Sequence, residues 1–285
     1  MGRLRFVISA VLTFCAATYL GYGLLLWVMQ ERMLFPAPGG IDVDALDQAA
    51  REIGAVPISL VASDGVRLYG WHQRRGSDRL LIYFPGNAET VAENVALHRL
   101  LLGAGWDVFA LAYRGYPGSE GSPTEAGVVL DALAAWAWAR GAGYAADRIV
   151  LHGRSLGGGI AAHLAEARNP AGLVLESTFV SARALARARA PIYPVDQLIR
   201  NPFDTIDRAP RVGVPVFLMH SRDDEVIPLH LGGVGLQPYF AEAEYHETSG
   251  LGHGHCLPVM DRVLREAYLA YLDATVPRRR RAGSR

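Results

Sequence analysis

One stretch decides the fold: Ile149-Val150-Leu151-His152-Gly153-Arg154-Ser155-Leu156-Gly157-Gly158. It joins a short apolar run, typical of a buried β-strand, to an alanine-rich segment with the composition of a helix. Between the two lies the pattern Gly-x-Ser-x-Gly, centred on Ser155. Glycines on either side of a sharp strand-to-helix turn remove side-chain collisions and leave the central hydroxyl exposed. We therefore predict that Ser155 is a nucleophile on such a turn; the alternative is a glycine-rich helix start that only packs tightly.

A nucleophilic serine needs a base, and the base needs an acid that orients it. On a sheet with this kind of turn, the acid and then the histidine follow the serine along the chain. Three acids, 223–225, come just after the apolar run 216–220, and His253 lies in a glycine-rich loop. The order Ser155, Asp224, His253 therefore fits a catalytic set. The alternatives are solvated loop charges for Asp223 and Glu225, and His255 as the base.

The other histidines have simpler interpretations. His152 and His220 end predicted strands, so we expect them to be buried and hydrogen-bonded. Four more lie within predicted strands or helices and are expected to be surface or packing residues: His72, His98, His163 and His246.

Acyl transfer also requires donors for the developing oxyanion. The backbone N–H of Leu156, directly after the nucleophile, is the first candidate. The second is the N–H of Asn87, in the loop Phe84-Pro85-Gly86-Asn87-Ala88 that follows a predicted strand. The alternative is a plain turn capped by Asn87.

Around this stretch, apolar runs alternate with helical segments, which indicates a mostly parallel sheet covered on both faces. Two further runs flank Ser63-Asp64-Gly65 and predict a β-hairpin, 58–62 with 66–71. The remaining predicted strands are 80–84, 108–113, 149–152, 173–176, 216–220 and 244–247. The predicted helices are 90–102, 124–140, 156–167, 231–240 and 257–273. The stretch 180–214, with six arginines and four prolines, interrupts the alternation and is a candidate cap or an ordinary pair of solvated helices.

Composition excludes several classes of protein. The chain has 285 residues, 51% of them hydrophobic, which excludes a disordered chain. Its 28 basic and 28 acidic residues cancel, so a general attraction to nucleic acid is not expected. Two cysteines, Cys15 and Cys256, exclude a disulfide scaffold and a cysteine-based zinc site. No metal or cofactor motif is present, and we expect no cofactor.

The amino terminus predicts a membrane anchor. Phe6 to Met29 contains no charged side chain and, as a helix, would reach about 36 Å, enough to cross a hydrocarbon core of about 30 Å. The alternative is a cleaved signal peptide, but the run is long for one and ends without a small-residue cleavage site. Arg3 and Arg5 precede the span, which places the rest of the chain outside the cytoplasm, on the periplasmic side in a bacterium. The expected organisation is an anchor (1–30), a linker (31–57), one catalytic domain (58–275) and a basic tail (276–285).

Several motifs taken in order resemble one family. They are Leu34-Phe35-Pro36, Gly86-Asn87-Ala88, Tyr113-Arg114-Gly115-Tyr116-Pro117-Gly118-Ser119-Glu120-Gly121, Gly153–Gly158, Glu176-Ser177-Thr178-Phe179, His220 with Asp224, and the loop ending at His253. This set resembles the α/β-hydrolases, and more narrowly the membrane-anchored serine hydrolases of the abhydrolase-domain group. The resemblance covers nearly all of the chain after Gln30 and assigns the acid to Asp224. Three residues depart from the family's common pattern: Pro85, Ala112 and Ser221.

The resemblance implies an α/β-hydrolase fold with a short cap, preceded by one transmembrane helix. It implies a serine hydrolase that cleaves carboxylic esters or thioesters through an acyl-enzyme, without a metal. The expected partners are a small-molecule or lipid-linked acyl substrate and the lipid bilayer, not nucleic acid. The alternatives are a peptidase, amidase or acyltransferase with the same residues, or a non-catalytic binding protein.

Overall fold

A computed structural model describes residues 2–279 of the chain, which contain one eight-stranded sheet. The strands lie in the order β1-β2-β4-β3-β5-β6-β7-β8. The first two pair antiparallel with each other, β2 pairs antiparallel with β4, and every other pair is parallel. The bounds are β1 Ala55–Val61, β2 Arg67–Gln73, β3 Leu80–Phe84, β4 Asp107–Ala112, β5 Ile149–Arg154, β6 Gly172–Glu176, β7 Val216–Ser221 and β8 Ala243–Thr248. The predicted strands are confirmed, with ends that shift by a few residues.

Burial follows the layered arrangement. Every residue of β3, β4, β5, β6 and β7 is buried, because helices cover both faces of the central parallel strands. The outer strands β1 and β8 have few buried positions, and most of their residues are partly or fully exposed. The α/β-hydrolase fold expected from the resemblance is confirmed.

Eleven α-helices lie in the described part of the chain. They are α1 Gly2–Leu34, α2 Val43–Glu52, α3 Val95–Gly103, α4 Glu125–Gly141, α5 Leu156–Arg168, α6 Ala182–Arg189, α7 Val195–Leu198, α8 Thr205–Arg208, α9 Gly233–Leu236, α10 Leu257–Met260 and α11 Arg262–Thr275.

Three predicted helices were wrong in their extent. The predicted helix 231–240 is two short 3-10 turns around α9, since Gly232 favours a break and Pro238 cannot continue an α-helix. The predicted helix 257–273 is interrupted at Asp261, whose side chain caps α11 by accepting from the N–H of Leu264. Residues 91–94 form a turn, and α3 begins only at Val95.

Helix α2 lies within the stretch expected to be a linker. Asp42 caps its amino terminus by accepting from the N–H of Asp44, and Leu46 and Ala50 are buried against the sheet. Its apolar positions are spaced four apart, the period of an amphipathic helix.

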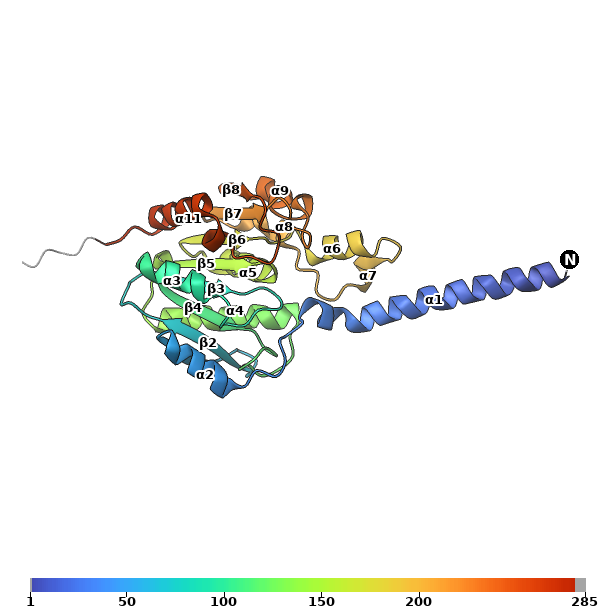
Figure 1. Ribbon diagram of the computed structural model, residues 1–285, viewed down its shortest axis with the longest axis horizontal. Coiled ribbons are helices and arrows are strands. Elements are labelled where there is room, and N and C mark those ends of the chain that lie inside the picture. Colours follow the sequence, from blue (N-terminus) through green and yellow to red (C-terminus); the bar gives the residue numbers. More distant parts are fainter. Residues whose placement is uncertain (1, 280–285) are drawn as a thin grey trace, which may run out of the picture.

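The stretch 180–214 divides into two parts. Helices α6 and α7 stand away from the sheet, whereas α8 packs against α5 and belongs to the body of the domain. We define the cap as the segment 181–200, which contains α6 and α7. Figure 1 shows α1 as one extended rod that leaves the body of the domain, with α6 and α7 beside its near end. In the basic tail, Arg279 pairs with Asp78, and residues 280–285 lie outside the described part.

The chain order of the strands determines where a site can form. From β3 the chain moves to β4 on one side, and β5 lies on the other side of β3. At such a reversal the loops after two neighbouring parallel strands diverge and leave a crevice at their carboxyl ends. Here those loops are 85–88 after β3 and the turn at Ser155 after β5.

Candidate active site

The turn between β5 and α5 holds Ser155 in an unusual conformation. Its φ of 50° and ψ of −118° lie in a region that side chains other than glycine seldom adopt. The N–H of Ser155 donates to the carbonyl of Glu176 at 2.8 Å, which fixes the turn against β6. A Cβ on Gly153 would lie 2.2 Å from the carbonyl oxygen of Gly157, so only glycine fits there.

Three side chains from distant parts of the chain meet at this turn. The Nε2 of His253 lies 3.0 Å from the Oγ of Ser155, and its Nδ1 lies 2.7 Å from the Oδ2 of Asp224. Both distances are within hydrogen-bond range. We call this chain of contacts the Ser–His–Asp relay. It contains the serine, histidine and acid that the chain order indicated.

Asp224 is surrounded by donors. Its Oδ1 accepts from the N–H groups of Val226 (2.9 Å) and Ile227 (2.7 Å), while its Oδ2 faces His253. Burial by itself raises the pKa of Asp224, but the hydrogen bonds from His220, His253 and Ile227 outweigh it, and the net pKa lies well below its ordinary value. The carboxylate therefore stays ionised at neutral pH and can hold an imidazole in one tautomer.

The neighbouring candidates have other contacts. Asp223 accepts from the hydroxyl of Ser221 and from the N–H of Gly250, so it holds the histidine loop to β7. Glu225 is exposed, and the Nδ1 of His255 lies 2.6 Å from the carbonyl of Leu251, within its own loop.

His220 is buried and hydrogen-bonded, as its place at a strand end suggested, but sequence reasoning did not predict that it supports the acid. Its Nδ1 accepts from the N–H of Gly233, which leaves the ring proton on Nε2. That N–H points to the carbonyl of Ile227 at 2.8 Å and lies 3.3 Å from Asp224. The buried ring of His220 therefore lies against the carboxylate of Asp224 and helps to hold it in place. His152 is likewise buried, between Tyr268 and Glu176, as its place at a strand end suggested.

The loop after β3 lies directly beside the nucleophile. A Cβ on Gly157 would be 2.0 Å from the carbonyl oxygen of Phe84, so α5 begins in close contact with the end of β3. Tyr113 donates to the carbonyl of Pro85 at 2.8 Å, and Tyr116 donates to that of Asn87. Leu156 is the first residue of α5, so its N–H has no earlier carbonyl within the helix to which it could donate.

Arg154 joins the loops on both sides of Ser155. Its guanidinium forms an ion pair with Glu89 and donates to the backbone carbonyl of His253. Glu89 in turn accepts from the N–H of Gly86 at 2.8 Å. Although Arg154 occupies the variable position of the Gly-x-Ser-x-Gly pattern, it is buried and spans the two loops. Because its partners are 65 or more positions away, no local pattern signals this role.

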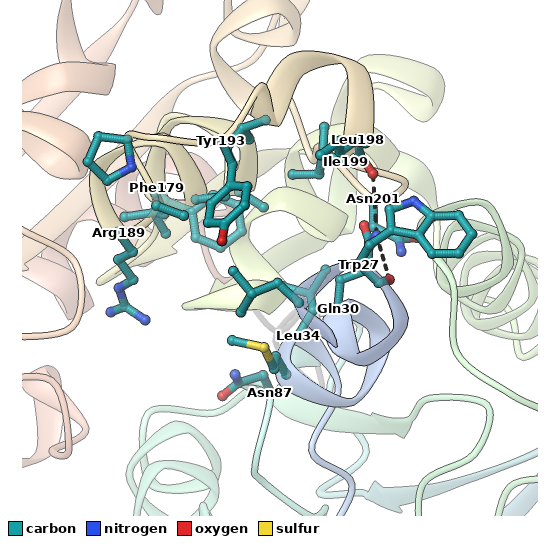
Figure 2. A pocket seen from close by; sticks show the side chains of 18 of the residues that line it. Trp27, Gln30, Leu34, Asn87, Phe179, Arg189, Tyr193, Leu198, Ile199 and Asn201 are labelled. Carbon is teal, nitrogen blue, oxygen red and sulfur yellow. Dashed lines mark hydrogen bonds between the residues drawn. The ribbon is translucent and has the colours of Figure 1, made fainter. Parts of the chain in front are cut away.

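Two cavities meet at Ser155 and Asn87, which line both of them. The first, the cap cavity, has a volume of about 570 Å³ and runs between the cap and α1. Figure 2 shows Trp27, Gln30 and Leu34 of α1 on one side and Tyr193, Leu198 and Ile199 of the cap on the other. The second, the loop cavity, has a volume of about 470 Å³ and is lined by Glu89, Arg154, His253 and their neighbours.

A family model and a relative of this chain both carry the name alpha/beta hydrolase. A family model described as the alpha/beta hydrolase fold matches residues 79–197. The chain is 30% identical over 261 residues to the uncharacterized protein Rv2307c of Mycobacterium tuberculosis, covering 90% of this chain and 91% of that protein. It is 30% identical over 250 residues to the alpha/beta hydrolase domain-containing protein WAV2 of Arabidopsis thaliana, covering 76% and 80%.

Two further similarities concern enzymes. The chain is 32% identical over 173 residues to the lysophosphatidylserine lipase ABHD12 of Xenopus tropicalis, a match that covers 54% of this chain and 45% of that protein. The solved structure of the Pyrococcus furiosus esterase Pf2001 aligns with a TM-score of 0.65 at 18% identity, covering 85% of this chain and 96% of that one. At this identity the structural match supports the fold alone.

Proposed function

This chain belongs to the α/β-hydrolase family, and on that premise we propose that it is a membrane-anchored serine hydrolase of carboxylic esters or thioesters. One observation carries the proposal: the hydroxyl of Ser155, the imidazole of His253 and the carboxylate of Asp224 lie in one unbroken chain of contacts. The similarity to a lysophosphatidylserine lipase favours an ester substrate.

The chemistry follows from this arrangement. The Oγ of Ser155 attacks the acyl carbon while His253 accepts its proton on Nε2. Asp224, ionised and held by backbone donors, keeps the proton of His253 on Nδ1 and stabilises the imidazolium that forms. The imidazolium then protonates the leaving alcohol or thiol. Water, deprotonated by the same imidazole, then attacks the acyl carbon of the acyl-enzyme. The bond to the Oγ of Ser155 breaks, the imidazolium returns its proton to that oxygen, and the acid leaves.

The charge that develops on the acyl oxygen needs donors that point at it. We assign this role to the backbone N–H groups of Asn87 and Leu156. The close contact of Gly157 with the end of β3 keeps the two loops together, and the bond from Tyr116 to the carbonyl of Asn87 fixes the peptide that follows the N–H of Asn87. Donors fixed before the reaction need no reorganisation, which is why such sites contribute several kcal/mol to catalysis, about 2.7–4 for one donor.

The two cavities suit the two halves of an ester. Both include Ser155 and Asn87, so a bond held at Ser155 would place one half in each. We assign the acyl group to the mostly apolar cap cavity. The leaving group would lie in the loop cavity beside His253, which must protonate it.

Helix α1 provides the membrane attachment in this proposal. It is the one helix among the described residues that is long and apolar enough to cross a bilayer, and none of its residues is buried. Arg3 and Arg5 before the span favour a cytoplasmic amino terminus and a catalytic domain on the other side of the membrane.

The experiment is a matched pair of serine variants. Ser155→Ala should lower ester hydrolysis by at least about 10³-fold while the fold is retained. Ser177→Ala is the control, because Ser177 is also buried and also has a positive φ (46°) but lies outside the relay. A fluorophosphonate probe should label the wild type and Ser177→Ala, and should not label Ser155→Ala. Hydrolysis by Ser155→Ala at the wild-type rate would refute the proposal.

A further inference from the structure

Helix α1 is attached to the cap at two places, and the first lies within the predicted span. The rings of Tyr19 and Tyr193 stack with their centroids 4.7 Å apart. Tyr19 donates to the carbonyl of Ile192 at 2.9 Å, and Tyr193 donates back to the carbonyl of Tyr19 at 3.0 Å. A Cβ on Gly23 would lie 2.7 Å from the ring of Tyr193, so the absence of a side chain allows this approach.

The second attachment is at the end of α1 nearest the domain. The guanidinium of Arg200 lies 4.4 Å from the centre of the Trp27 ring and pairs with Glu31 at 2.9 Å. Gln30 accepts from the N–H of Arg200 at 2.8 Å and donates to the carbonyl of Leu198 at 3.3 Å. These polar contacts fix both the position of α1 and its rotation about its own axis.

From the first attachment to a point beyond the second, α1 forms a side of the cap cavity. The α1 residues that line it include Tyr22, Gly23, Leu26, Trp27, Met33 and Leu34. From Tyr22 to Leu34 the helix advances about 18 Å along this wall. Ser155 and Asn87 line the same cavity. A single face of the anchor helix thus leads from the predicted span to the nucleophile.

We propose that α1 is part of the substrate-binding site and that a long acyl chain lies along it in the cap cavity. This proposal rests on the proposed function and adds residues that select the acyl group. The lining is mostly apolar, and Gln30, one of its few polar side chains, already has partners in the cap. An aliphatic chain therefore matches the cavity better than a polar group, which would lose its hydrogen bonds to water.

The position of this wall also gives the acyl chain a route into the cap cavity. Residues 22–29 belong both to the predicted span and, in part, to the cavity wall. The cap tip, where the side chain of Ile192 is 69% exposed, lies beside Tyr19 at the level of the span. An acyl chain moving from the bilayer along α1 would reach Ser155 without passing through bulk water, which avoids the cost of exposing its apolar surface.

The test uses full-length protein in nanodiscs and two neighbouring leucines. Leu26 lines the cavity, whereas Leu25, one position away on the same helix, is 54% exposed and lies outside it. We expect Leu26→Trp to lower kcat/KM for p-nitrophenyl laurate by at least about 10-fold, and that for p-nitrophenyl acetate by less than about 2-fold. Leu25→Trp, which adds the same bulk facing lipid, should leave both values unchanged.

A second variant removes side-chain volume at the same position. Leu26→Ala enlarges the cavity, so the ratio of laurate to acetate hydrolysis should not fall as it does in Leu26→Trp. The proposal is overturned if Leu26→Trp and Leu25→Trp give the same laurate-to-acetate ratio, because α1 would then be a tether and nothing more.

A binding measurement separates this proposal from the proposed function. In the Ser155→Ala background, a fluorescent long-chain fatty acid should bind, and Leu26→Trp but not Leu25→Trp should weaken that binding. This result does not depend on turnover. If wild-type protein hydrolyses no ester yet shows this binding pattern, the proposed function fails and the cavity assignment stands. Equal binding by the two tryptophan variants would overturn the assignment even in an active enzyme.

Discussion

The guanidinium of Arg154 donates a hydrogen bond to the backbone carbonyl of His253, 99 positions further along the chain. The same guanidinium pairs with Glu89, whose carboxylate accepts from the N–H of Gly86. One side chain next to the nucleophile therefore connects the loop that carries the base with the loop that we assign to the oxyanion.

This connection predicts that Arg154 is a positioning residue. Arg154→Gln should lower kcat by about 10²-fold with little change in KM, because a shift of about 1 Å in the base affects the transition state more than substrate binding. Arg154→Lys should recover part of the loss, since an ammonium can pair with Glu89 but lacks the second arm for His253. The measurement is kcat and KM for a short ester.

The control for Arg154 is Arg222→Gln, which removes an exposed guanidinium paired with Glu247 on the surface. It should leave both constants unchanged. If Arg154→Gln raises KM alone, or if its lost activity follows only from unfolded protein in a thermal melt, the positioning role is wrong.

The assignment of the acid gives a second prediction. Asp224→Asn should lower kcat by about 10⁴-fold, because an amide can hold the imidazole of His253 in the wrong tautomer and cannot stabilise its positive charge. Glu225→Gln is the matched change on an exposed neighbour outside the relay, and it should retain activity. Equal losses in the two variants would contradict the choice of Asp224.

The contact between α5 and β3 gives a third prediction. Gly157→Ala should destabilise the protein by about 3 kcal/mol or more, because the new Cβ would collide with the carbonyl of Phe84. Gly141→Ala makes the same change in helix α4, with no atom within 4 Å, and should be neutral or slightly stabilising. Chemical denaturation of both variants measures the difference; similar midpoints would refute the steric explanation.

A fourth prediction concerns acid stability and His98. This ring is 1% exposed and neither ring nitrogen has a partner, and burial lowers its pKa to about 4. Between pH 6.5, the ordinary pKa of histidine, and pH 4, the unfolded chain binds a proton at this residue and the folded protein does not. Lowering the pH through this range therefore favours the unfolded state. The free energy of unfolding should be about 2 kcal/mol lower at pH 5 than at pH 7 because of this residue alone.

His98→Leu should remove that part of the pH dependence, because it leaves no group to protonate. The control is His230→Leu, which deletes a histidine that is exposed. Urea titrations at pH 7 and pH 5 measure how much the free energy of unfolding of each variant changes between the two pH values. A His98→Leu protein that loses as much stability as the wild type between pH 7 and pH 5 would show that other groups control it.

The sequence predicted most of the sheet because buried parallel strands are short, continuous apolar runs, as in 149–152 and 216–220. The prediction from sequence was less accurate where the end of a helix depends on a single residue. Asp261 ends one helix and caps the next, and Gly232 separates a 3-10 turn from α9, so the predicted helices there were too long. Helix α2 was missed because its apolar positions are few.

By itself, the sequence determined the turn at Ser155, the order of serine, acid and histidine, and an apolar segment long enough to span a membrane. These depend on local constraints: glycines at a tight turn, strand and helix periods, and an uncharged run. Only the tertiary structure decided which groups surround them. Arg154 meets His253 at a separation of 99 positions, and Tyr19 meets Ile192 at a separation of 173. Such contacts depend on how distant elements pack together, and no local pattern along the chain records that packing.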